Sequence, residues 1–162
     1  MKELAYFYPE GHEAHFETGH PERPARVTAI RKALNDEGLW DPYPKLEPIR
    51  VPEAVYQNVH APAYLSYLKQ ACQNGQGLDA DTYTTQASWE LAKNAAGGAC
   101  AVADAVWKGQ ARHGLALTRP PGHHTTHSQG MGFCLLNNIA LAAEYLIGQA
   151  GLQNLAIVDL DV

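Results

Sequence analysis

A run of apolar residues at 155–162 places the strongest constraint on the fold, because only Asp159 and Asp161 interrupt it. A short, continuous apolar run is typical of a strand buried on both faces of a parallel sheet. Such a sheet needs helices on both sides. The run therefore predicts an α/β chain. It also predicts that the two aspartates share one face, because side chains two residues apart in a strand point the same way.

The rest of the chain alternates between strand and helix patterns, which favours the same α/β class. The stretch 86–108 is a long alanine-rich helix pattern that contains Gly97 and Gly98. Glycine in a helix interior costs about 1 kcal/mol relative to alanine, so small residues there indicate close packing against another element. The spacing also predicts strands at 4–8 and 115–118, helices at 25–35, 62–72 and 138–149, and irregular loops at 9–24, 36–52, 74–85 and 119–132.

Composition excludes several classes of protein. The net charge is −5 and the basic residues are scattered, which argues against direct nucleic-acid binding. We find no apolar stretch long enough to span a membrane and no signal-peptide pattern, so no membrane association is expected. The three cysteines form no CxxC pair, which favours a reduced cytoplasmic protein. We see no domain boundary and expect a single domain over 1–162.

Two histidines in one loop are the first candidates for chemistry. His123 and His124 follow Arg119 and a rigid Pro-Pro-Gly turn, at the end of a predicted strand. Ligands of open α/β sheets bind beyond the carboxyl ends of strands. Histidine is the usual proton carrier near neutral pH. The string therefore predicts a catalytic loop, and the alternative is a surface loop whose histidines have no role.

Two further strings support a site. Gly132 allows a backbone to approach a ligand closely, and Phe133 fits the wall of an apolar channel; the alternative places Phe133 in the core at an ordinary helix start. Asp159 and Asp161 on one buried face would need compensation, and a metal ion is the simplest form of it. The alternative is a strand end where both carboxylates reach solvent or cap a helix.

Together these strings resemble the histone-deacetylase family. Further support comes from the strings at 20–26, 79–83 and 88–90, and the first of these is most similar to bacterial and class II-like members, with acetylpolyamine amidohydrolases as near relatives. The resemblance implies an arginase/deacetylase-like fold, a three-layer parallel sheet with helices on both faces. This chain would then be the N-terminal half, one partial domain over 1–162 with the C-terminal half of the family domain absent.

The resemblance also implies roles at the reacting centre. Asp161 matches the first ligand of a catalytic zinc ion. His124 matches the general base and acid, and His123 matches the hydrogen-bonding partner of the zinc-bound water. Asp159 matches the carboxylate that orients His123, and it also matches a ligand of a structural potassium ion near the zinc.

Four residues match the family's substrate and channel positions. Gly132 would offer its carbonyl to the substrate amide, and Phe133 would line the tunnel for an acyl-lysine stem. Asp81 matches a rim carboxylate that grips the substrate backbone, and Arg23 matches the arginine of an internal channel. A surface ion pair is the alternative for both Asp81 and Arg23.

Three hypotheses for function follow. In the first, the full-length protein uses zinc to hydrolyse the amide of an acetylated lysine, or of a small acetylated amine, and the 162-residue chain alone is inactive. In the second, the chain is a non-catalytic binding or regulatory half-fold that pairs with another chain, as a homo-oligomer or with a complementing partner, through its last strand. In the third, the histidine-rich loops store or sense metal. A separate idea is that His123, His124 and His127 form a local metal site.

Overall fold

The computed structural model describes residues 2–161, and its centre is a sheet of two parallel strands. Strand β1 is Lys2–Phe7 and strand β2 is Ala111–Ala116. They pair in register from Lys2 opposite Ala111 to Phe7 opposite Ala116. About a hundred residues separate the strands, and four helices fill that crossover. The expected α/β class with a parallel sheet is confirmed.

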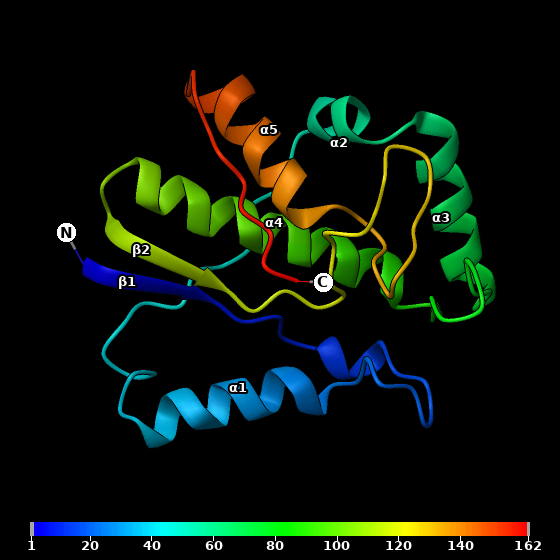
Figure 1. Ribbon diagram of the computed structural model, residues 1–162, viewed down its shortest axis with the longest axis horizontal. Helices are drawn as coiled ribbons and strands as arrows, with labels where there is room; N and C mark the ends of the chain where they lie inside the picture. Colours follow the sequence, from blue (N-terminus) through cyan, green and yellow to red (C-terminus); the bar gives the residue numbers. More distant parts are fainter. Residues whose placement is uncertain (1, 162) are drawn as a thin grey trace.

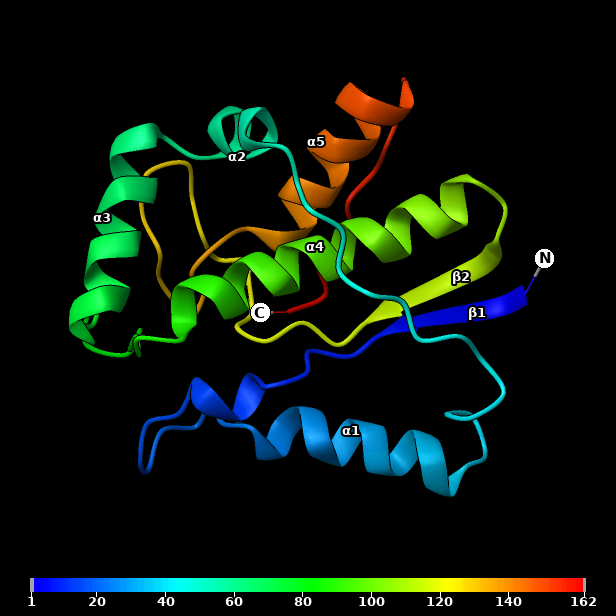
Figure 2. The ribbon, with the colours of Figure 1, turned by 180° about the vertical axis from the view of Figure 1, so that it is seen from behind.

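Helices cover both faces of this sheet (Figures 1 and 2). Helix α1, Ala25–Asp36, lies on one side. Helices α4, Ser88–Trp107, and α5, Asn138–Ala150, lie on the other and pack against each other. The shorter helices α2, Glu53–Val59, and α3, Pro62–Asn74, gather at one end of the α4 layer, and a 3-10 turn, η1, covers His12–Ala14. The order helix, sheet, helix gives the three layers expected from the sequence.

The close packing expected at Gly97 and Gly98 is confirmed. A Cβ atom on Gly98 would lie 2.2 Å from Cδ1 of Phe7, and one on Gly97 would lie 2.4 Å from the carbonyl oxygen of Ile49. No side chain fits within such distances, because real carbon atoms approach only to about 3.5 Å. Helix α4 therefore lies directly against strand β1 and against the segment before α2.

The hydrophobic core lies between α2, α3, α4 and α5 and extends into the segment that precedes α5. Leu135 and Leu136 are fully buried there beside Leu68 and Leu141. Each buried leucine side chain contributes roughly 1.5–3 kcal/mol of apolar transfer free energy. This burial anchors the residues that follow Phe133, and it fixes one end of the candidate catalytic loop.

The predicted strand at 155–162 is wrong for this structure. Residues 155–161 form no regular strand, and Val158 and Leu160 are 77% and 88% exposed; Val162 lies outside the described residues. A strand forms only by hydrogen bonding to a neighbour, and within residues 2–161 the sheet contains only β1 and β2. Among residues 2–161, no helix is long and apolar enough to cross a membrane.

Candidate active site

The tandem histidines and the two aspartates meet beyond the carboxyl ends of the strands. The chain leaves β2 and enters the loop at 119–137, and the last described residues return to the same place (Figure 1). The rings of His123 and His124 are in contact, with centroids 3.9 Å apart. His123 Nδ1 lies 2.9 Å from Oδ2 of Asp159, and His123 Nε2 lies 3.2 Å from Oδ2 of Asp161. Four of the expected residues therefore form one cluster.

The contacts of His123 give its ring a defined orientation. Because a carboxylate only accepts, the Nδ1–H group of His123 donates to Asp159. The hydrogen bond from His123, followed by one from the backbone N–H of Asp161, lowers the pKa of Asp159. The Asp159 carboxylate therefore stays ionised near neutral pH, and it holds the Nε2 edge of His123 toward Asp161.

A metal ion would fit this cluster. One ligand atom from each of His123, His124 and Asp161 lies within 4.8 Å of the others, and His124 Nε2 is 4.0 Å from Asp161 Oδ2. Imidazole nitrogen and carboxylate oxygen are the donors that zinc accepts. All three side chains are partly exposed, so an ion and a water molecule can reach them.

Gly132 lies directly beside His124, and Phe133 follows it in the same loop. A Cβ atom on Gly132 would be 2.7 Å from Cδ2 of His124, so only glycine fits there. Gly132 and Phe133 both have positive φ, 56° and 69°. For phenylalanine this left-handed conformation is unfavourable by about 1–2 kcal/mol. The backbone N–H of Phe133 donates to Oγ1 of Thr82 over 3.2 Å, which joins the loop to the segment that carries Asp81.

Asp81 lies on an exposed segment that the N-terminal loop holds in place. Its carbonyl oxygen accepts a hydrogen bond from His20 Nε2 over 3.0 Å, and its own N–H donates to the carboxylate of Asp79 over 3.1 Å. The ring of His20 also lies edge-on to Phe133, with centroids 4.8 Å apart. The structure thus brings Asp81 near the candidate tunnel wall, and its expected role as a rim carboxylate remains a prediction.

Arg23 does not lie in the buried region behind the histidine loop. Its side chain is exposed, and the arginine buried behind the histidine loop is Arg119. The half-exposed Arg26 lies 3.9 Å from Oε1 of Glu22 at the edge of that buried region. Position 23 sits on the solvent side of the start of α1, so its predicted channel role has no contact behind the site to support it.

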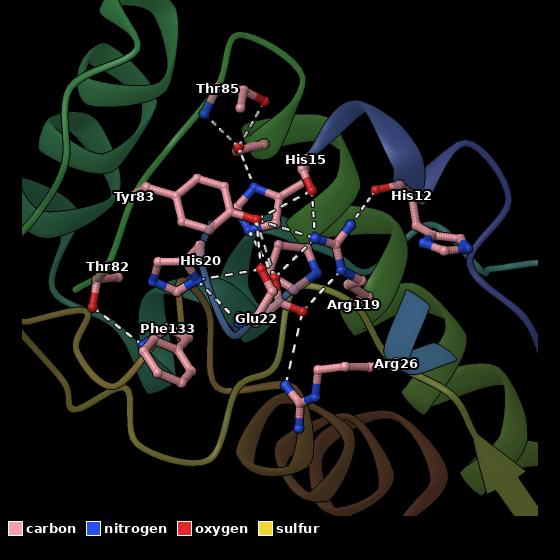
Figure 3. Close-up of polar contacts among 12 residues, drawn as sticks. His12, His15, His20, Glu22, Arg26, Thr82, Tyr83, Thr85, Arg119 and Phe133 are labelled. Carbon is pink, nitrogen blue, oxygen red and sulfur yellow. Dashed lines mark hydrogen bonds and ion pairs between the residues drawn. The ribbon is translucent and has the colours of Figure 1, made fainter. Parts of the chain in front are cut away.

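The sequence interpretation missed the buried cluster around Arg119 (Figure 3). Arg119 is fully buried and forms a two-pronged ion pair with Glu22, at 2.8 Å and 2.9 Å. Its guanidinium also donates to the carbonyl oxygens of His12 and His15 and, over 3.1 Å, to the hydroxyl of Tyr83. Glu22 belongs to the string at 20–26 and Arg119 to the string at 119–124. Because 97 positions separate them, no local sequence pattern indicates that they pair.

A second missed feature is the clasp formed by Val59, His60 and Ala61. His60 Nδ1 donates to the carbonyl of Thr126 over 3.1 Å, and His60 Nε2 accepts from the N–H of Asn137 over 3.0 Å. Ala61 N–H donates to the carbonyl of His127, and His127 Nδ1 donates to the carbonyl of Val59. Among the described residues, the ligand atoms that gather with His123 and His124 come from Asp161 and not from His127, which disfavours the local metal site of the three histidines.

Comparisons with known proteins agree with this geometry. The family model described as "Histone deacetylase domain" matches residues 20–162. The chain is 40% identical to an uncharacterized protein of Synechocystis over 90% of this chain and 50% of that protein. It is 35% identical to a probable deacetylase of Archaeoglobus fulgidus over 88% of this chain and 40% of that protein. The chain therefore spans half or less of the length of these relatives.

Two further matches extend the range of relatives. The mouse polyamine deacetylase HDAC10 is 36% identical over 87% of this chain and 22% of its own length. Among solved structures, the HD domain of HDA15 superposes with a TM-score of 0.84 at 32% identity, over 93% of this chain and 44% of that one. Sequence and structure therefore point to the same set of proteins.

Proposed function

The chain belongs to the histone deacetylase family, and we propose that the full-length protein is a zinc-dependent amide hydrolase. Its substrate would be an acetylated lysine side chain or a small acetylated amine, and water would cleave the amide into acetate and the free amine. The observation that carries this proposal is the cluster of His123, His124, Asp159 and Asp161. Relatives named polyamine deacetylases support a small acetylated amine as one substrate class.

The residues of this chain have distinct roles in the proposed reaction. Zinc held by Asp161 and further ligands would polarise the acetyl carbonyl and lower the pKa of its bound water. His124 would accept a proton from the attacking water and return it to the leaving amine nitrogen. His123, fixed through Nδ1 by Asp159, would hydrogen-bond the same water through Nε2. Asp159 is also our candidate ligand for a structural potassium ion.

The loop that begins at Gly132 would bind the substrate. The Gly132 carbonyl would accept the amide N–H, and Phe133 would contact the apolar stem that carries the acetyl group. Asp81 would bind the substrate backbone at the rim. Arg23 would serve the internal channel only if it moved from its exposed position, so Arg119 and Arg26 fit that region better.

We expect the 162-residue polypeptide alone to have little or no activity. A catalytic zinc site normally uses three protein ligands and one open position. Asp161 is the position here that matches a family zinc ligand. The two nearby donors, His123 and His124, are assigned to the water and to proton transfer, so this polypeptide would bind zinc weakly. We further propose that the protein is cytoplasmic, because its three cysteines are buried free thiols.

The experiment compares full-length wild-type protein with His124→Ala and Asp161→Asn, using an acetyl-lysine peptide and an acetylated polyamine. We expect His124→Ala to lower kcat by about 10²–10⁴-fold, the usual contribution of a general acid and base. Zinc removal with a chelator should abolish turnover, and added zinc should restore it. His113→Ala is the matched control, since His113 lies exposed on β2. Full activity of His124→Ala would show that the proposal is wrong.

One observation favours the second candidate function, a half-fold that pairs with another chain. The segment at 157–160 exposes Ile157, Val158 and Leu160, which is an apolar surface that a partner or a second copy could cover. Analytical ultracentrifugation of the protein, with and without zinc, tests this idea. A monomer that hydrolyses acetylated substrates would exclude it. The third candidate, metal storage, is disfavoured because His12, His15 and His60 are buried.

A further inference from the structure

Three segments distant in sequence meet at the buried guanidinium of Arg119. Glu22 belongs to the N-terminal loop, Tyr83 to the segment that carries Asp81, and Arg119 itself to the loop that carries the tandem histidines. Figure 3 shows the three side chains converging from separate parts of the ribbon. Each of the three segments carries a candidate functional residue, so this junction can set where those residues lie relative to one another.

The junction is rigid because its charges and donors are matched. Arg119 and Glu22 are both at most 2% exposed and share two hydrogen bonds. His15, which stacks on Tyr83, adds no positive charge, because burial and, second, the nearby Arg119 lower its pKa to about 3. A buried ion pair with well-aligned hydrogen bonds has few alternative arrangements. Arg119 thus forms a fixed reference point behind the histidine loop.

The segment at 81–83 is held by three consecutive residues, each with a different partner. The carbonyl of Asp81 accepts from His20 Nε2, and the hydroxyl of Thr82 accepts from the N–H of Phe133. The hydroxyl of Tyr83 accepts from Arg119 Nη2 over 3.1 Å.

The Tyr83 hydroxyl donates in turn to the Glu22 carboxylate or to a carbonyl of Glu22 or His15, each 3.2 Å away. Burial raises the pKa of Tyr83, so this hydroxyl keeps its proton. The contacts of this hydroxyl with Arg119, and with Glu22 or His15, tie the segment at 81–83 to the fixed junction.

The ring of Tyr83 also contacts two histidine rings of the N-terminal loop. It stacks on His15 with centroids 4.3 Å apart and an interplanar angle of 14°. The edge contact with His20 has centroids 4.7 Å apart. A phenylalanine at position 83 would keep these ring contacts and lose only the hydroxyl. The hydroxyl can therefore be tested without emptying the site.

We propose that Tyr83 is a positioning residue that sets the place of Asp81 relative to His123 and His124, and that it thereby determines how well substrates reaching the rim are bound. The proposal rests on the proposed function only in the role given to Asp81. Tyr83 itself has no contact with His123 or His124 among its hydrogen bonds and ring contacts, and it lies away from the expected position of the scissile amide. Its loss should thus weaken binding of long substrates and leave the chemical step intact.

The experiment compares Tyr83→Phe with wild type in the full-length protein, on an acetyl-lysine peptide and on a short acetylated amine that ends inside the tunnel. The hydroxyl accepts one hydrogen bond and donates another, and one such bond usually contributes about a fivefold effect. We therefore expect KM for the peptide to rise at least about fivefold, with kcat and both constants for the short substrate unchanged. In an Asp81→Ala background, Tyr83→Phe should have no further effect on KM. Tyr56→Phe is the matched control, because Tyr56 is equally buried but lies in the core around α2.

Hydrogen exchange decides the positioning claim independently of activity. Amides at 79–84 should exchange at least about fivefold faster in Tyr83→Phe, because the hydrogen bonds of the hydroxyl at the junction are lost, and at the wild-type rate in Tyr56→Phe. Unchanged exchange at 79–84 overturns the inference, and so does an equal loss of kcat/KM on both substrates. If wild type hydrolyses neither substrate, the proposed function is wrong, and the exchange result still supports or overturns the placement of Asp81 by Tyr83.

Discussion

Replacing Glu22 with glutamine should destabilise the protein strongly, because it leaves the Arg119 charge buried without its partner. Glu22 accepts from Nε and Nη2 of Arg119, and neither side chain reaches solvent. Breaking a buried pair from one side lowers the free energy of unfolding by about 3–5 kcal/mol. Glutamine still offers one acceptor, and the carbonyls of His12 and His15 remain bonded to Arg119. We therefore expect the lower end, about 3 kcal/mol.

Urea unfolding followed by circular dichroism measures this change, and the midpoint should fall by roughly 1–3 M. The matched control is Glu90→Gln, whose ion pair with Lys93 is exposed and should be worth less than about 0.5 kcal/mol. The double variant Glu22→Leu/Arg119→Met should recover part of the loss, because no charge stays buried. A Glu22→Gln protein within about 1 kcal/mol of wild type would refute the reasoning that this pair is desolvated and strongly coupled.

The remaining predictions concern three histidines. The pKa of His15 is about 3 in the folded chain and about 6.5 in the unfolded chain. Its contribution to the free energy of unfolding is therefore fully present above pH 6.5 and is lost as the pH decreases toward 3. Unfolding free energy should drop by about 2 kcal/mol between pH 7 and 5, and His15→Phe should flatten that slope in urea titrations. His60→Ala strands two backbone groups and should cost about 2–4 kcal/mol, with faster exchange of the Asn137 amide as the direct readout. His127→Ala should leave zinc affinity within about threefold of wild type in a chelator competition, and a much larger loss would revive the local metal site.

Helices α3 and α5 were predictable from sequence because local signals mark their ends. Helix α3 has Pro62 in its first turn and Gly75 in the left-handed conformation after its end. In α5, the side chain of Asn137 caps the first turn by accepting from Ala140 N–H. Helix α2 was missed, since it is seven residues long and lies between prolines that favour an irregular interpretation.

The candidate site was predictable only in part. The strings around His123 and Asp161 identify residues that the structure brings together, although the segment with Asp161 reaches the carboxyl ends of β1 and β2 as an irregular chain and not as a strand. Pairing across the fold leaves no such local mark. Arg119 and Glu22 are distant in sequence, and a single chain gives no sign that they neutralise each other. The apolar run at 155–162 predicts a strand, but strand formation depends on a neighbouring strand, and no local pattern shows whether one is present.

The left-handed backbone at Phe133 sets stability and function against each other at one position. Phenylalanine is held there at φ 69°, where glycine would relieve about 1–2 kcal/mol of strain. Selection for heat resistance alone would therefore favour glycine at 133, and it would remove the aromatic ring from beside His20 and the histidine loop. In a library that varies position 133, selection for melting temperature should enrich glycine, and a separate selection for turnover should enrich phenylalanine.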